Sequence, residues 1–217
     1  MPDRPIIFLG PSLSRGEAEQ ILDADYRPPL RAGDLDSVRT RSVIGVVDGV
    51  LEKTSRIPAV EVRRAMDRGI RFFGSASTGA LLAIEIDAAG FVGMGEVFSF
   101  LKEYRGNREE LVISLYAEHD NTILTVPLIN AVLALAHVSQ LKAHALAASL
   151  CQIPLENRMW DRIENHVGQM LGGTLKVHLS QERNKNPKAN DARLLLRHLK
   201  NEGPRGQTLH SASTLGP

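Results

Sequence analysis

The fold is decided by residues 70–86, which read IRFFGSASTGALLAIEI. Residues 70–73 have the length of a short buried strand, and only one of the four is charged. The six residues that follow, 74–79, are all glycine, serine, alanine or threonine, and residues 80–86 form an apolar helical segment. A strand that passes through a tight turn directly into a helix is typical of parallel α/β sheets.

The chain before this stretch follows the same alternation. Apolar runs at residues 6–9 and 43–47 have the length of buried parallel strands, and helical patterns follow both. Ser14 and Glu17 have the spacing of a capping box, in which the hydroxyl and the carboxylate accept from free N–H groups. Residues 26–36 contain a Pro-Pro and a Gly-Asp pair, so we expect a loop there. The pattern predicts an α/β fold with a mostly parallel sheet and flanking helices.

The second half of the chain is predicted to be mainly helical. Two further strands are expected around residues 111–116 and 122–126, before a series of apolar, alanine-rich helical patterns begins. We therefore predict an α/β core over residues 1–126, a helical C-terminal region packed on it over 127–202, and a disordered tail over 203–217.

The composition argues against several classes of function. Among 217 residues, 26 Lys+Arg against 25 Asp+Glu leave a formal charge of +1, without the basic excess of a nucleic-acid binder. The single cysteine, Cys151, excludes an intramolecular disulfide and a multi-cysteine metal site. No apolar run reaches the ~18 residues that cross a bilayer, and the N-terminus lacks a secretory pattern. We expect a cytoplasmic protein with no metal, membrane or nucleic-acid partner.

The turn at residues 74–79 is also the candidate site, because ligands of open α/β sheets bind at the carboxyl ends of the strands. Ser77 and Ser75 are candidate nucleophiles, and the free N–H groups of a helix N-terminus favour an anion or an oxyanion. The predicted anion-binding residues are Gly74, Ser75, Thr78 and Gly79. The framing of Ser77 as G-x-x-S-x-G differs from the nucleophile elbow and from a Walker loop. A turn that uses small residues only for packing is the alternative interpretation.

Two charged residues near this turn are further cleft candidates. Asp48 ends the neighbouring predicted strand, so its carboxylate would point to the same edge, although Asp-Gly is also common turn chemistry. Arg63 belongs to a cluster of arginines around one predicted helix. Such a cluster is usually a solvated face, but beside an anion-binding turn it can dock an acidic partner.

Taken together, the motifs of this chain resemble the TfuA-like family. Residues 73–85 are similar to the family signature G-x-x-S-M-G-A-L-R-A-x-E, and Lys188 with Asp191 matches its C-terminal helix. The other matching motifs occur in the family's order at residues 7–13, 26–29, 33–34, 44–49, 93–98, 130, 158–160 and 195–196. The resemblance covers most of the chain and implies both a fold and a function.

The resemblance implies a role beside YcaO enzymes, which use ATP to activate a peptide-backbone amide so that sulfur replaces its oxygen. A TfuA-like protein is thought to release this sulfur from a thiocarboxylated ThiS-like carrier protein, and to help YcaO engage its peptide substrate. The matching nucleophile is Ser77; backbone N–H groups would hold the oxyanion and a neutral lysine would take the proton. ATP is then used by the YcaO partner, and this chain is expected to need no cofactor.

The sequence departs from the family where a His-Lys-Glu triplet is usual before the signature strand. Val62, Arg63 and Arg64 hold those places, and an arginine stays protonated and cannot act as a general base. Lys188 and Lys53 are the candidate replacements.

Three hypotheses follow from these observations. The first is a serine-based thiocarboxylate hydrolase that uses Ser77 and Lys188, and the second is a non-catalytic adaptor that binds YcaO and its peptide. The third is an unrelated enzyme that binds a phosphate at the turn, but the chain lacks the expected G-x-G-x-x-G context and acidic ribose partner.

Overall fold

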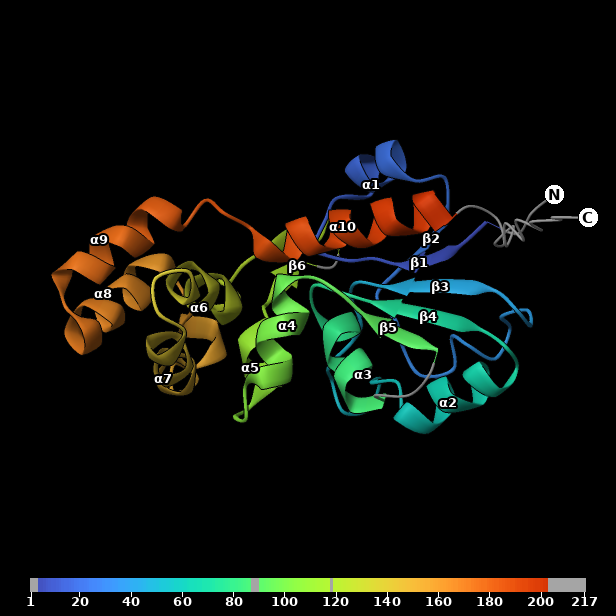
Figure 1. Cartoon of the computed structure of the whole chain (residues 1–217), viewed down its shortest axis with the longest axis horizontal. Helices are drawn as coiled ribbons and strands as arrows, with labels where there is room; N and C mark the ends of the chain where they lie inside the picture. The colour runs from blue at the N-terminus through green and yellow to red at the C-terminus, as the bar shows by residue number, and fades with distance from the viewer. Residues whose placement is uncertain (1–3, 87–89, 118, 203–217) are drawn as a thin grey trace, which may run out of the picture.

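The computed structural model describes residues 4–86, 90–117 and 119–202. Its centre is a five-stranded parallel sheet in the order β2-β1-β3-β4-β5 (Figure 1). The strands are β1 (Ile6–Phe8), β2 (Asp25–Arg27), β3 (Val43–Val46), β4 (Arg71–Gly74) and β5 (Phe91–Gly93). The α/β fold class predicted from the alternating pattern is confirmed.

Each face of the sheet is covered by two helices. The helices are α1 (Arg15–Ile21) and α10 (Pro187–Glu202) on one face, and α2 (Ala59–Asp67) and α3 (Thr78–Ile86) on the other. Successive strand residues point to opposite faces, so Ile7 packs toward α1 and α10 whereas Phe8 packs toward α2. Both faces are therefore apolar, which explains why the strands are continuous apolar runs in the sequence.

The strand order places the topological switch point between β1 and β3. The chain goes from β1 outward to β2 on one side, and then crosses to β3 on the other side of β1. Loops that leave neighbouring strands in opposite directions open a crevice at their carboxyl ends, where ligands of doubly wound sheets bind. The loops after Phe8 and Val46 flank this crevice.

A helical region lies at one end of the sheet (Figure 1). It has its own core, to which α3 contributes Ala80 and Leu81. Its elements are α4 (Glu96–Glu103), α5 (Arg108–Val112), α6 (Leu128–Ala136), α7 (Gln140–Leu150), a 3-10 turn (Leu155–Asn157), α8 (Trp160–Leu171) and α9 (Gly173–Glu182). After α9 the chain returns to the sheet, where α10 lies beside α1. A helical C-terminal region after the sheet is confirmed, while the domain limits at 126 and 202 stay a prediction.

The structure corrects several local predictions. Leu111 and Val112 belong to α5 rather than to a strand, because both pack into the core of the helical region. Only a small antiparallel hairpin, β6 (Tyr116–Ala117) with β7 (Thr122–Ile123), remains of the two strands predicted there. Residues 26 and 27 close β2 instead of opening a loop, and β5 and α9 were not predicted.

The capping box predicted at Ser14 and Glu17 is formed only in part. The Ser14 hydroxyl accepts from the Glu17 N–H at 3.3 Å, as the capping box requires, but the Glu17 carboxylate pairs with Arg193 of α10 instead of capping the helix. The predicted tail at residues 203–217 lies outside the described residues. In the described part of the chain, no helix has the length and apolarity needed to span a membrane.

Candidate functional site

A cavity of about 250 Å³ lies at the carboxyl edge of the sheet, beside the switch point. Ser77 lines it from the start of α3, Asp48 from the loop after β3, and Lys188 from the start of α10. The other lining residues are Pro11, Pro29, Gly49, Val50, Leu51, Glu52, Thr78, Val112, Ile113, Ser114, Leu115 and Tyr116. The fold thus brings the predicted nucleophile and the predicted lysine into one cavity, although they are far apart in the sequence.

The turn that carries Ser77 is sharp and strained. Ala76 has a φ of 63°, the left-handed region, which costs a residue other than glycine about 1–3 kcal/mol. The Ser77 N–H donates to the Ser75 carbonyl at 2.7 Å, and the Ser77 carbonyl accepts from Ala80 at 3.1 Å and Leu81 at 3.2 Å. Ser77 is therefore the residue from which α3 starts, at the positive end of the helix dipole. Strain of this kind is typical of functional turns.

The two glycines of the turn are required by packing. A Cβ on Gly79 would lie 1.8 Å from the Val46 carbonyl oxygen, and one on Gly74 would lie 2.1 Å from the Gly79 oxygen. The Ser75 and Gly79 N–H groups donate to the carbonyls of Val46 at 3.1 Å and Val47 at 3.3 Å. The packing interpretation thus accounts for both glycines and for two of the N–H groups that were expected to face a ligand.

Of the residues predicted to bind an anion, Thr78 is left as a donor, because the N–H groups of Ser75 and Gly79 already bond to carbonyls. Its hydroxyl donates to the Gly49 carbonyl at 2.9 Å, which leaves the side chain in the wall of the cavity. Among residues 4–86, 90–117 and 119–202, no hydrogen bond engages the Thr78 N–H. The first N–H groups of a helix have no intrahelical acceptor, so the Thr78 N–H is the candidate donor for an oxyanion.

Lys188 is a buried amine with one hydrogen bond to the part of the chain that the structure describes. The residue is 3% exposed, and Nζ donates to the Val112 carbonyl at 3.0 Å. Burial lowers the pKa of the Lys188 amine because the charged form loses hydration, and the nearby negative charge of Asp48 partly opposes this. A larger share of this lysine is therefore neutral than of a surface lysine. Within the described residues no hydrogen bond joins its Nζ to the Ser77 hydroxyl.

Asp48 holds the loop after β1. One carboxylate oxygen accepts from the N–H groups of Gly10 at 2.9 Å and Ser12 at 3.1 Å, and the other accepts from the Ser12 hydroxyl at 2.7 Å. This loop is where doubly wound folds of the same strand order receive a phosphate or a flavin. Here an internal carboxylate already occupies its donors, which weighs against the phosphate-binding hypothesis.

The other predicted charged residues lie elsewhere. Arg63 is an exposed residue of α2 and lines no part of the cavity, and the same holds for Arg64 in the place of the family's glutamate. Val62, which precedes the two arginines in α2, is buried and packs into the core against the sheet. Lys53 is exposed and outside the cavity, so Lys188 is the lysine that the structure brings near Ser77.

Asp191 is a positioning residue that the sequence identified only as a motif match. Its carboxylate accepts from the N–H groups of Glu96 at 2.9 Å and Val97 at 2.8 Å, and so caps α4. Burial raises the pKa of Asp191 to about 6, against the lowering effect of those two hydrogen bonds. Because Asp191 lies one helical turn after Lys188, this contact fixes the start of α10 and with it the lysine. In the sequence, the Lys-x-x-Asp spacing of Lys188 and Asp191 was the one feature that could have indicated this positioning role.

Comparisons with known proteins bear on this geometry. A family model described as TfuA-like protein matches residues 48–157, half of the chain. The matched range contains Asp48 and Ser77 and ends before Lys188. A search of curated proteins found no match. The family match supports an accessory role in thioamidation in general, and the family is generally associated with YcaO partners.

Proposed function

Because the chain belongs to the TfuA-like family, we propose that it releases hydrosulfide from a thiocarboxylated ThiS-like carrier protein for a YcaO partner. The peptide substrate of YcaO receives the sulfur. One observation carries this proposal: a serine at a helix N-terminus and a buried lysine line the same cavity. Serine and neutral lysine are together sufficient for acyl transfer, without a metal or a histidine.

In the proposed reaction, the Ser77 oxygen attacks the thiocarboxylate carbon while neutral Lys188 takes the hydroxyl proton. The oxyanion of the tetrahedral intermediate lies near the Thr78 N–H and the positive end of α3. When the intermediate collapses, the C–S bond breaks and Lys188 returns the proton to sulfur, which leaves as HS⁻. The products of this half-reaction are a carrier ester on Ser77 and hydrosulfide.

Water then completes the cycle. Lys188, neutral again, takes a proton from water as the water oxygen attacks the ester carbon. The bond to Ser77 breaks, and Lys188 reprotonates the serine oxygen. The carrier leaves with an ordinary carboxylate, whose proton, the second of the water molecule, passes to the solvent. The lowered pKa of Lys188 suits it to this double use, because the amine must be neutral before each attack.

The test is sulfide release from a thiocarboxylated ThiS-type carrier by the wild type and by Ser77→Ala. We expect a loss of roughly a thousandfold or more in Ser77→Ala, as for other nucleophile removals. Ser75→Ala is the matched control, since the Ser75 hydroxyl is in the same turn but is buried and has no partner among the described residues. Release that survives in Ser77→Ala would rule out this nucleophile.

A non-catalytic adaptor is the second candidate. Two observations favour it: the places of the family's His-Lys-Glu triplet hold Val62, Arg63 and Arg64, and the Ser77 hydroxyl has no direct hydrogen bond to Lys188. A folded wild-type protein that binds YcaO and its peptide yet releases no sulfide from the carrier would establish the adaptor function.

A further inference from the structure

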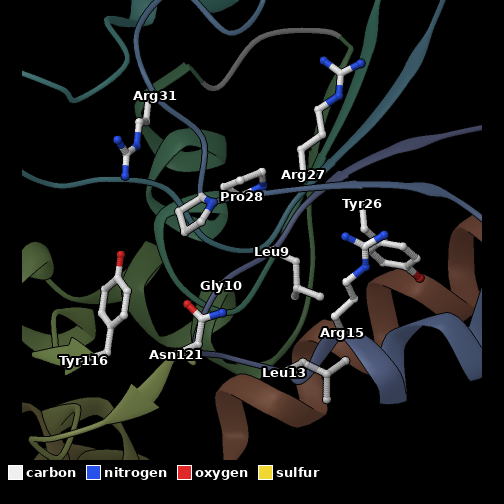
Figure 2. A pocket seen from close by; sticks show the side chains of 11 residues that line it. Leu9, Gly10, Leu13, Arg15, Tyr26, Arg27, Pro28, Arg31, Tyr116 and Asn121 are labelled. Atoms are coloured by element: carbon white, nitrogen blue, oxygen red, sulfur yellow. The ribbon is translucent and has the colours of Figure 1, made fainter. Parts of the chain in front are cut away.

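A second pocket, of about 320 Å³, adjoins the cavity. Pro29 and Tyr116 line both, so the two spaces meet at these residues. Figure 2 shows this pocket, with Arg31 and Tyr116 on one side and Arg15 on the other. Its described lining includes three arginines, the third being Arg27, and no aspartate or glutamate. The charged side chains in its described lining are therefore all arginines, next to the candidate site.

The three arginines are supplied by separate elements and differ in their partners. Arg15 is the first residue of α1 and pairs with Glu19 at 2.7 Å, while Arg27 ends β2 and pairs with Asp25 at 2.8 Å. The guanidinium of Arg31 has no ion pair within the part of the chain that the structure describes. The Asp34 carboxylate accepts from the Arg31 backbone N–H at 2.8 Å and, among the described residues, leaves the guanidinium without an ion pair. Arg31 thus offers this guanidinium in a pocket that also contains the apolar side chains of Leu9 and Leu13.

We propose that this pocket binds an acidic peptide segment of the protein whose C-terminal thiocarboxylate reacts at Ser77. The inference rests on the proposed function and adds its substrate class: a carrier with acidic residues shortly before its reactive end. An extended peptide advances about 3.3 Å per residue, so a tail that ends in the cavity reaches the adjoining pocket within a few residues. Guanidinium groups bind carboxylates through two parallel hydrogen bonds, which makes an arginine pocket selective for Asp and Glu side chains.

The two adjoining spaces have complementary tasks in this arrangement. The cavity holds the reacting group beside Ser77 and Lys188, and the arginine pocket holds the segment that precedes it. Pro29 lines both spaces and Pro28 lines the arginine pocket, and both are rigid because proline fixes its own backbone. A free small anion would use only the charge of the pocket, whereas a peptide tail would use both spaces at once.

The experiment measures the binding of two synthetic peptides by fluorescence anisotropy. Both have about ten residues and a free C-terminal glycine carboxylate; one carries Glu and Asp before its end, and the other carries Gln and Asn in the same places. We expect the acidic peptide to bind wild-type protein at least about tenfold more tightly at ~50 mM NaCl, and this advantage to shrink at ~300 mM. Arg31→Gln should reduce the advantage by about fivefold or more.

The controls separate this inference from the proposed hydrolysis. Arg63→Gln, which changes an exposed arginine outside both spaces, should leave binding of the acidic peptide unchanged. Equal binding of the two peptides, or full selectivity in Arg31→Gln, would overturn the inference even if sulfide is released. Competition by inorganic phosphate that removes all binding of both peptides equally would instead assign the pocket to free anions. Selective binding without sulfide release would overturn the hydrolase alone.

Discussion

The two sides of the cavity are held in place by different kinds of interaction. Ser77 is positioned by backbone packing between adjacent elements, because Gly74 and Gly79 let α3 lie directly against β3 and β4. Lys188 is positioned by side-chain contacts across long stretches of sequence, namely its own bond to Val112 and the Asp191 cap on α4. The position of Ser77 should therefore be disturbed by added atoms that clash with the backbone. The position and reactivity of Lys188 should instead depend on the charges of buried groups and on pH.

The largest effect is expected on the serine side, from Gly79→Ala. Its Cβ would lie 1.8 Å from a backbone oxygen of β3, which no side-chain movement can relieve, so α3 must shift. We expect the free energy of unfolding to fall by about 3 kcal/mol. Urea denaturation measures this value.

Gly16→Ala is the control for that substitution. Gly16 lies in α1, where an added methyl group would have no neighbouring atom within 4 Å, and alanine favours the helix by roughly 0.5–1 kcal/mol. We expect no loss of stability there. A Gly79→Ala protein as stable as wild type would show that α3 is free to move from the sheet, and that Ser77 is not held by packing.

On the lysine side, Asp191 makes stability depend on pH. Its pKa is about 6 in the folded chain against an ordinary value of 3.8, so the folded state holds the proton more tightly. The contribution of Asp191 to stability is therefore complete below about pH 4 and is lost as pH rises through about 6. At ~1.4 kcal/mol per pH unit, the loss amounts to about 2–3 kcal/mol.

The measurement compares urea denaturation of the wild type and Asp191→Asn between about pH 4 and pH 7, a range set by that pKa. We expect the stability of the wild type relative to the variant to decrease across this range. A relative stability that increases with pH would mean that the two N–H bonds outweigh the cost of burying the charge, and would contradict the raised pKa.

This contrast also explains what the sequence predicted and what it did not. The strand, turn and helix around Ser77 follow from neighbouring residues, so residues 70–86 predicted both the parallel sheet and the serine at its edge. Lys188 reaches the cavity only because α10 returns to the sheet after the helical region, and no local pattern encodes that return. The strand prediction at Leu111 and Val112 was wrong for the same reason: their apolar character is explained by packing against distant helices.

Lys188→Met should change the free energy of unfolding less than Gly79→Ala does, but it should lower the rate of sulfide release strongly. Methionine removes a buried charge and one hydrogen bond to Val112, two changes that oppose each other, so stability should stay within about 1 kcal/mol of wild type. Sulfide release should fall by roughly a hundredfold or more. Release by the wild type should rise with pH until Lys188 is neutral, with a midpoint below the ordinary lysine pKa of 10.5.

Lys53→Met is the matched control for Lys188→Met, since Lys53 is exposed and outside the cavity. Its release and pH profile should equal those of the wild type. If Lys188→Met keeps both the rate and the pH profile, then Lys188 is a buried structural amine. The lysine side of the cavity would then be structural only, and would take no part in the reaction.

The smallest effect is expected outside the cavity, at Arg31. A residue that only holds the segment before the reacting group contributes equally to the ground state and the transition state, so Arg31→Gln should raise KM about fivefold and leave kcat unchanged. Steady-state sulfide release from an acidic-tailed carrier measures both constants. A lower kcat at unchanged KM would place Arg31 in the reaction itself, and the arginine pocket would then be part of the chemical site rather than a separate binding region.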